Sequence, residues 1–175
     1  DVKAGTENSK LKEEAYSLRV TPVGALITAM DTRGFYYGMK TLEQLLLRRG
    51  GTTTIAACDI VDWPDFEIRG FMNDVGRNYM PLPLIARELD SMAQLKLNVY
   101  HFHFTEIPGW RLESKIYPEL NAPENYTRMP GKFYTQKEFK QLVEYCRLRN
   151  ILLIPEMDMS GHSQMFRKAL NVKMS

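Results

Sequence analysis

Residues 98 to 111 read Asn98-Val-Tyr-His-Phe-His-Phe-Thr-Glu-Ile-Pro-Gly-Trp-Arg111, and the rest of the chain is arranged around them. The first half is apolar, β-branched and aromatic, which predicts a buried β-strand. The second half is polar and breaks at Pro108-Gly109, which predicts a loop that carries Glu106. Alternate side chains of a strand point the same way, so His101 and His103 share a face. These histidines are either hydrogen-bonded groups of the core or part of a functional site at the end of the strand.

Two further strands and two helices are predicted around this segment. The strands cover residues 68–75 and 151–158, because both are apolar runs that end in polar residues. Pro81 and Pro83 open a helix between the first two strands, since proline is tolerated in a first turn. The capping box Thr135-Gln-Lys-Glu138 begins the next helix. The order β-α-β-α-β predicts parallel strands joined by crossover helices, as in a barrel or a doubly wound sheet.

Polar side chains gather where each of these predicted strands ends. Ligands bind at the carboxyl ends of parallel strands in both kinds of fold. One such side chain is weak evidence, because a lone carboxylate can simply cap a helix or pair with a lysine. Three successive strand ends with carboxylates and imidazoles favour an active site over that structural interpretation. The side chains are Asn73, Asp74 and Arg77 after the first strand, His103 and Glu106 after the second, and Glu156, Asp158 and His162 after the third.

The N-terminal third of the chain has a different pattern of apolar and polar residues. Alternating segments at 15–20 and 25–29 flank a Pro/Gly turn and predict a β-hairpin. Apolar residues then recur at helical spacing, and Arg48-Arg49-Gly50 predicts the end of that helix. This β-β-α arrangement is typical of the end of a small α+β domain. Residues 60–65 are expected to be an extended linker because of Pro64, which sets the domain boundary near Asp59.

Composition argues against several classes of protein. The chain has 175 residues, a net charge of +2 and scattered basic residues, so neither nucleic acid nor an anionic membrane is expected as a partner. No apolar stretch approaches the ~20 residues that a membrane span needs. The two cysteines, Cys58 and Cys146, fit no zinc-binding spacing. The chain begins with Asp1 rather than Met, so we expect a processed product or an excised piece.

A series of motifs runs in order along nearly the whole chain: Arg69-Gly-Phe-Met-Asn-Asp74, His101-Phe-His-Phe-Thr-Glu106, Gly109-Trp-Arg111, Tyr117-Pro-Glu-Leu120 and Ile154-Pro-Glu-Met-Asp-Met-Ser-Gly-His162. Taken together, these motifs resemble glycoside hydrolase family 20, the β-N-acetylhexosaminidases. The family has an α+β domain followed by a (β/α)8 TIM barrel. The resemblance implies that residues 1–58 are the C-terminal part of the α+β domain and that residues 59–175 are the first three β/α units of the barrel. A complete barrel takes about 250 residues, so the chain is expected to be a fragment.

The resemblance also implies a reaction, the removal of terminal N-acetylglucosamine or N-acetylgalactosamine by retaining hydrolysis. In this family the acetamido carbonyl of the sugar attacks its own anomeric carbon, an exception among glycosidases. An Asp orients the acetamide and an adjacent Glu protonates the leaving oxygen. No Asp-Glu dipeptide occurs in the sequence, so the chain alone is expected to be inactive. No cofactor is implied, and the parent enzyme is expected to be periplasmic, secreted or lysosomal.

Four residues match a supporting set of this family. Arg69 matches an arginine that binds the ring hydroxyls of the terminal sugar. Glu106 and His162 match a carboxylate–imidazole pair that holds the absent acid and tunes its pKa, and Asp158 matches the acidic residue four positions before that histidine. Glu106 stands where the family usually has Asp, and Gly76 stands where Ser or Ala is commoner.

Two other functions fit some of these residues. A metal-dependent hydrolase would use His101, His103, Asp158 and His162, whose side chains are metal-ligand types. A non-catalytic sugar-binding fragment would bind a sugar weakly through Arg69. Three β/α units also leave a sheet edge and the inner face uncovered, so we expect self-association through the open half-barrel.

Overall fold

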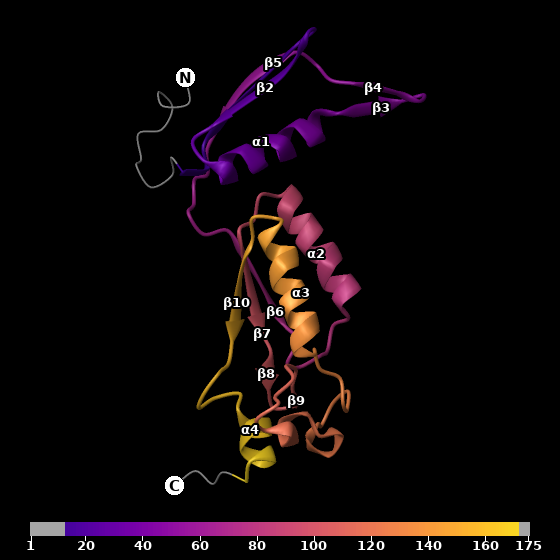
Figure 1. The fold of residues 1–175 in the computed structure, drawn as a ribbon, viewed down its shortest axis with the longest axis vertical. Helices are drawn as coiled ribbons and strands as arrows, with labels where there is room; N and C mark the ends of the chain where they lie inside the picture. The colour runs from indigo at the N-terminus through magenta and orange to yellow at the C-terminus, as the bar shows by residue number, and fades with distance from the viewer. Residues whose placement is uncertain (1–12, 172–175) are drawn as a thin grey trace. The chain divides into compact units, whose positions relative to one another are not determined.

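The computed structural model describes residues 13–171, which divide after Arg69 into two units with separate hydrophobic cores (Figure 1). The first unit has a three-stranded antiparallel sheet in the order β2-β1-β5, with one helix packed on it and a separate two-stranded hairpin. Its core consists of Tyr16, Leu18 and Val20 from β1 with Tyr37 from the helix. Its elements are β1 (Tyr16–Thr21), β2 (Gly24–Ala29), α1 (Thr32–Leu45), β3 (Leu47–Arg49), β4 (Thr52–Thr54) and β5 (Cys58–Asp62).

Two expectations for the first unit differ from the structure. Residues 60–62 of the expected 60–65 linker belong instead to β5, which pairs with β1, because Cys58 and Ile60 pack against the core and Pro64 restricts only the residue before it. The units therefore divide at Arg69 rather than near Asp59. Helix α1 also ends earlier than expected, because Leu47–Arg49 pairs with β4 across a turn of two glycines at positive φ.

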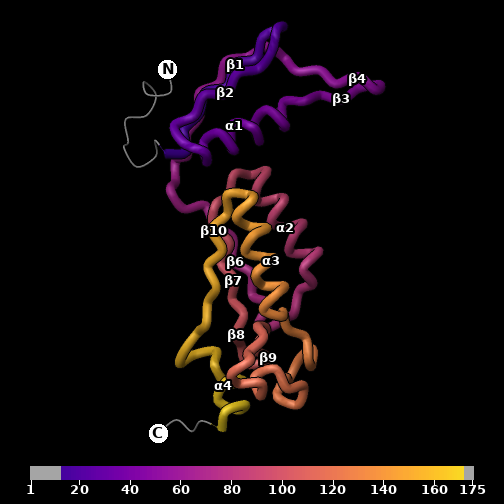
Figure 2. Tube along the Cα trace, viewed as in Figure 1, coloured from indigo at the N-terminus to yellow at the C-terminus, as the bar shows by residue number. Residues whose placement is uncertain are grey.

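The second unit has a parallel three-stranded sheet in the order β10-β7-β6. Figures 1 and 2 show these strands side by side, with the two long helices along one face. The alternation of parallel strands with crossover helices agrees with the order expected from the sequence. The elements are β6 (Gly70–Asp74), α2 (Leu82–Gln94), β7 (Val99–His103), β8 (Thr105–Glu106), β9 (Gly109–Trp110), η3 (Pro118–Asn121), η4 (Pro123–Asn125), α3 (Gln136–Arg147), β10 (Leu152–Glu156) and α4 (Gln164–Ala169).

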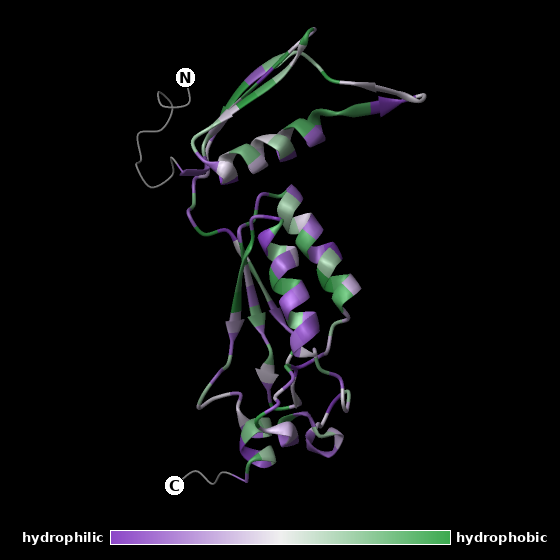
Figure 3. Cartoon of the chain, viewed as in Figure 1, coloured by the Kyte–Doolittle hydropathy of each residue, from purple (hydrophilic) through white to green (hydrophobic). Residues whose placement is uncertain are grey.

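Local chemistry explains where the two long helices begin and which face they bury. Pro81 precedes α2, and the buried side chains of that helix include Ile85 and Leu89. Thr135 caps α3 with the expected capping box, in which the hydroxyl accepts from the Glu138 amide at 3.1 Å and the Glu138 carboxylate accepts from the Thr135 amide at 2.8 Å. Figure 3 shows apolar and polar residues alternating along both helices, as amphipathic packing requires.

The opposite face of the parallel sheet is only partly covered. Met72, His101 and Ile154 lie in one row across β6, β7 and β10. Met72 is 47% exposed and Ile154 is 43% exposed, although both side chains are apolar. Among the described residues, no helix has the length and apolar character needed to cross a membrane.

Candidate active site

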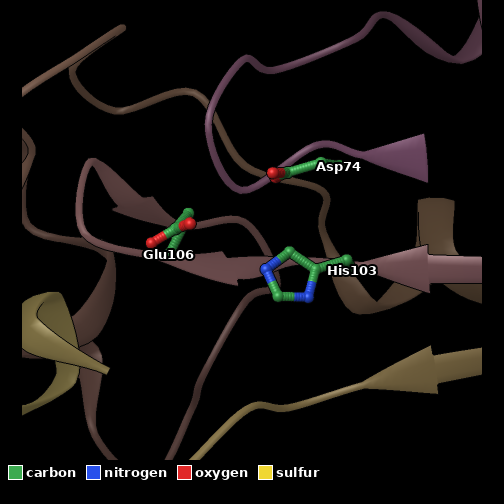
Figure 4. Close-up of side chains that lie close together, drawn as sticks. All are labelled: Asp74, His103 and Glu106. Carbon is green, nitrogen blue, oxygen red and sulfur yellow. The ribbon is translucent and has the colours of Figure 1, made fainter. Parts of the chain in front are cut away.

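The polar strand ends predicted from the sequence meet at one edge of the parallel sheet. The register places Asp74 beside His103 and His103 beside Glu156, so three strands end at the same level. Figure 4 shows Asp74, His103 and Glu106 converging from β6, β7 and β8. Their potential ligand atoms all lie within 4.8 Å of one another. This edge therefore brings together carboxylates and an imidazole from three strands.

Glu106 and His162 form a hydrogen-bonded pair although 56 residues separate them in the sequence. The distance from His162 Nδ1 to Glu106 Oε2 is 2.7 Å. The short β8–β9 hairpin holds Glu106, which is only 2% exposed, whereas the side chain of His162 is about half exposed. His162 has a φ of 45°, a conformation uncommon for residues other than glycine and found disproportionately at functional sites. The structure therefore brings the predicted pair together.

Each partner shifts the pKa of the other toward the charged state. Burial acts to raise the pKa of Glu106, but the Ile107 amide, His162 and the charge of Arg77 outweigh it, so this pKa is lowered. The hydrogen bond and the charge of Glu106 raise the pKa of His162, with a smaller contribution from Asp158. The geometry thus favours an imidazolium–carboxylate pair over a neutral one.

Arg77 is the site residue that sequence reasoning left unassigned. Its guanidinium lies 2.8 Å from Glu106 Oε2 and 3.2 Å from Asp74 Oδ2, and its amide donates to Asp74 Oδ1 at 2.9 Å. The side chain is 55% exposed, so it reaches the carboxylates and still faces solvent. The sequence indicated Arg77 only as one of the polar residues that follow the first parallel strand. Spacing alone does not show which of those residues contacts the site.

Arg69 has different partners. Its guanidinium binds Glu14 Oε2 at 2.6 Å and the carbonyl of Phe66 at 2.7 Å. It precedes β6, so the whole strand separates it in sequence from the polar end at Asp74. A sugar-binding role for Arg69 stays a prediction, and the contacts described here are those of a structural arginine.

Asp158 lies beside the Glu106–His162 pair. Its amide donates to the hydroxyl of Thr105 at 3.0 Å, which ties the loop after β10 to β8. Asp158, Glu106 and His162 line one small pocket together with Trp110 and other residues. The predicted supporting residues of the second unit thus share one pocket.

The two histidines of β7 share a carboxylate rather than forming a metal centre with Asp158 and His162. Glu156 Oε2 lies 2.5 Å from His101 Nε2 and 2.8 Å from His103 Nδ1. Burial acts to raise the pKa of Glu156, and the two histidines outweigh it and lower this pKa.

The potential ligand group that the described residues do form is Asp74, His103 and Glu106. The guanidinium of Arg77 already binds the carboxylates of Asp74 and Glu106, and its positive charge would repel a metal cation. The metal-dependent alternative is therefore not favoured.

Comparison with known proteins follows the division into two units. The model "Glycosyl hydrolase family 20, catalytic domain" matches residues 66–174, and "Glycosyl hydrolase family 20, domain 2" matches residues 1–63. A β-hexosaminidase of Porphyromonas gingivalis is 39% identical over 166 residues, which cover 87% of this chain and 21% of that protein. A β-hexosaminidase subunit beta of Rattus norvegicus is 37% identical over 161 residues, which cover 91% of this chain and 30% of that protein.

A solved structure of a family 20 enzyme is also similar to this chain. The GH20 exo-β-N-acetylglucosaminidase from Vibrio harveyi in complex with N-acetylglucosamine matches with a TM-score of 0.86 and 33% identity. The match covers 94% of this chain and 28% of that protein, so the chain spans 21–30% of the length of these three relatives. The catalytic-domain model alone matches more than half of the 175 residues. The chain belongs to glycoside hydrolase family 20.

Proposed function

We propose that the chain is a fragment of an exo-β-N-acetylhexosaminidase, with its second unit supplying the first three β/α units of a TIM barrel. The single observation that carries this proposal is the Glu106–His162 pair at the carboxyl end of the parallel strands. That is the edge where barrel enzymes bind their substrates. Terminal N-acetylglucosamine or N-acetylgalactosamine would be the sugar removed.

In this proposal Glu106 and His162 support the catalytic acid instead of acting as the acid. Glu106 stays ionised and accepts the Nδ1 proton of His162, which fixes the orientation of the imidazole and leaves Nε2 for another partner. The orienting Asp and the acid Glu would be supplied by residues outside the 175-residue sequence, since it contains no Asp-Glu dipeptide.

We further propose Arg77, rather than Arg69, as the guanidinium that meets the sugar hydroxyls. Arg77 follows the carboxyl end of β6, contacts Glu106 and is half exposed, so its remaining N–H groups can donate to a ligand. Arg69 is already bound by Glu14 and a backbone carbonyl. In the active parent protein, Arg77→Gln should therefore raise KM for the sugar far more than Arg69→Gln does.

The proposed function predicts a clear difference between two proteins. The purified 175-residue chain should show no turnover of an aryl N-acetyl-β-glucosaminide, because the acid and the acetamide-orienting carboxylate are absent. The product of the same reading frame extended through the next parallel strand and the rest of the barrel should release the aryl alcohol. Turnover by the 175-residue chain, or none by the folded longer protein, would contradict the proposal.

Self-association of the isolated chain follows from the same proposal. The row of Met72, His101 and Ile154 would face the barrel interior in the parent protein and is partly exposed here. We expect light scattering to give a dimer or larger species. Ile154→Lys should shift that species toward the monomer, whereas Ile116→Lys, at a side chain 82% exposed elsewhere, should not. A monomeric unmodified chain would refute this prediction.

A further inference from the structure

Arg111 is a fully buried arginine that the proposed reaction does not use. It is 0% exposed, and its guanidinium donates hydrogen bonds to five backbone carbonyls. These belong to two segments far apart in the sequence, the turn after β6 and the loop before α3. The acceptors are Val75 and Gly76 at 3.2 Å each from Nε, Met129 at 3.2 Å and Lys132 at 2.9 Å from Nη1, and Arg128 at 3.0 Å from Nη2.

The surroundings of Arg111 are built to accept a buried cation. Among the described residues no carboxylate forms an ion pair with it, so carbonyl dipoles and the face of Tyr126, 5.0 Å away, compensate its charge. Gly109 leaves room for this stack, since an added Cβ would lie 2.7 Å from Arg111 Cζ and 2.7 Å from the Tyr126 ring. Burial lowers the pKa of Arg111, yet a guanidinium remains protonated in proteins. Burying a charged side chain costs free energy. What Arg111 offers in return is a planar guanidinium whose five N–H donors have a fixed geometry.

One segment that Arg111 holds leads directly into the candidate site. The amides of Val75 and Gly76 both donate to the carbonyl of His103, at 3.0 and 3.1 Å, while their own carbonyls accept from Arg111. The next residue is Arg77, which pairs with Glu106. Hydrogen bonds to His103 and to Arg111 therefore hold the Val75–Gly76 turn immediately before Arg77.

Gly76 brings this turn unusually close to the strand that carries Glu106. An added Cβ would lie 2.8 Å from Glu106 Cβ, 3.0 Å from the carbonyl carbon of Thr105 and 3.1 Å from the Glu106 amide nitrogen. Gly76 is not among the residues with positive φ, so the requirement is space rather than backbone conformation. A side chain at this position would require the turn or the Thr105–Glu106 backbone to shift.

We propose that Arg111 is a positioning residue that fixes the Val75–Gly76 turn and thereby places Arg77 against Glu106. It acts through those two carbonyls and contacts neither the pocket nor a ligand. The inference deepens the proposed function, because it names what holds that site together. It concerns the geometry of the unliganded chain, so it can be tested with no substrate present.

The test follows the imidazole of His162 by NMR of chains labelled with 13C in the histidine rings. Glu106, Asp158 and Arg77 are the charged groups that act on His162, and Arg77 lowers its pKa. Arg77→Gln should therefore raise the pKa of His162. Arg111→Lys keeps the charge but loses the five-donor fork, and it should raise that pKa in the same direction. The double variant should match Arg77→Gln alone, because once Arg77 lacks a charge its placement no longer matters.

Other variants separate positioning from general stability. Gly76→Ala leaves Arg111 intact but crowds the turn against Thr105 and Glu106, so it should reproduce the shift caused by Arg111→Lys. Arg147→Lys, at an exposed pair on α3, should leave the pKa of His162 unchanged. An unchanged pKa in folded Arg111→Lys, or additive shifts in the double variant, would overturn the proposal. Loss of folding in both Arg111→Lys and Gly76→Ala would also overturn it, by assigning Arg111 to the stability of the whole unit. None of these outcomes bears on the turnover assay of the parent enzyme.

Discussion

Phe102→Ala should lower the free energy of unfolding of the second unit by about 3–5 kcal/mol. Phe102 is 0% exposed on the central strand β7. Its ring lies 5.4 Å from that of Tyr134 and 5.8 Å from that of Phe139, measured between centroids. Truncation would leave a cavity between the sheet and the helices, which close packing cannot fill without strain. Since a whole domain is stable by about 5–15 kcal/mol, this single change would remove a large part of the total.

The matched control for this prediction is Phe71→Ala on the neighbouring strand. Phe71 is already 46% exposed, so its truncation should cost clearly less. Urea unfolding would be followed through Trp110, which packs on Phe104 and Phe166, in a Trp63→Phe background that silences the tryptophan of the first unit. Equal losses for the two phenylalanine variants would mean that the second unit does not form this core in solution.

The alternation of parallel strands and helices in the second unit was predictable because it depends on local patterns. Apolar runs of strand length and a capping box act over a few residues, and the crossover rule then leaves little choice of topology. The linker expected over residues 60–65 was wrong at residues 60–62, because their pairing with β1 is a tertiary interaction between residues about 40 positions apart. The conformational restriction imposed by Pro64 does not show which strand the preceding residues pair with.

The candidate site was predictable to the level of strand ends but not of individual contacts. Periodicity placed His101 and His103 on one face, and the parallel register then decided that both would meet Glu156. The family motif points to Arg69, which precedes β6, whereas the arginine that contacts Glu106 is Arg77, which follows the strand. Sequence spacing alone does not decide which of the two meets a sugar. The role of Arg111 depends on five carbonyls from distant segments, which no sequence spacing encodes.

Glu106→Gln should lower the pKa of His162 back toward its ordinary value of 6.5, because it removes the negative charge and replaces the charge-assisted hydrogen bond with a neutral one. The variant should also destabilise the second unit by about 2 kcal/mol near pH 5.5, the usual contribution of a hydrogen bond to a charged group. Histidine NMR titration and urea unfolding measure the two effects. Glu119→Gln, at an exposed carboxylate, is the control.

The stability lost in this variant should depend on pH in a definite way. The lowered pKa of Glu106 means that its contribution is present above the ordinary value of 4.5 and is lost as the pH falls through the folded-state value. The raised pKa of His162 means that its contribution is complete below 6.5 and is lost as the pH rises through its own folded-state value. The difference between the parent chain and Glu106→Gln should therefore be greatest between pH 4.5 and 6.5 and shrink on both sides. A difference that stays constant from pH 4 to pH 8 would show that Glu106 and His162 do not share a proton-linked contact, and the site would then need another explanation for its buried carboxylate.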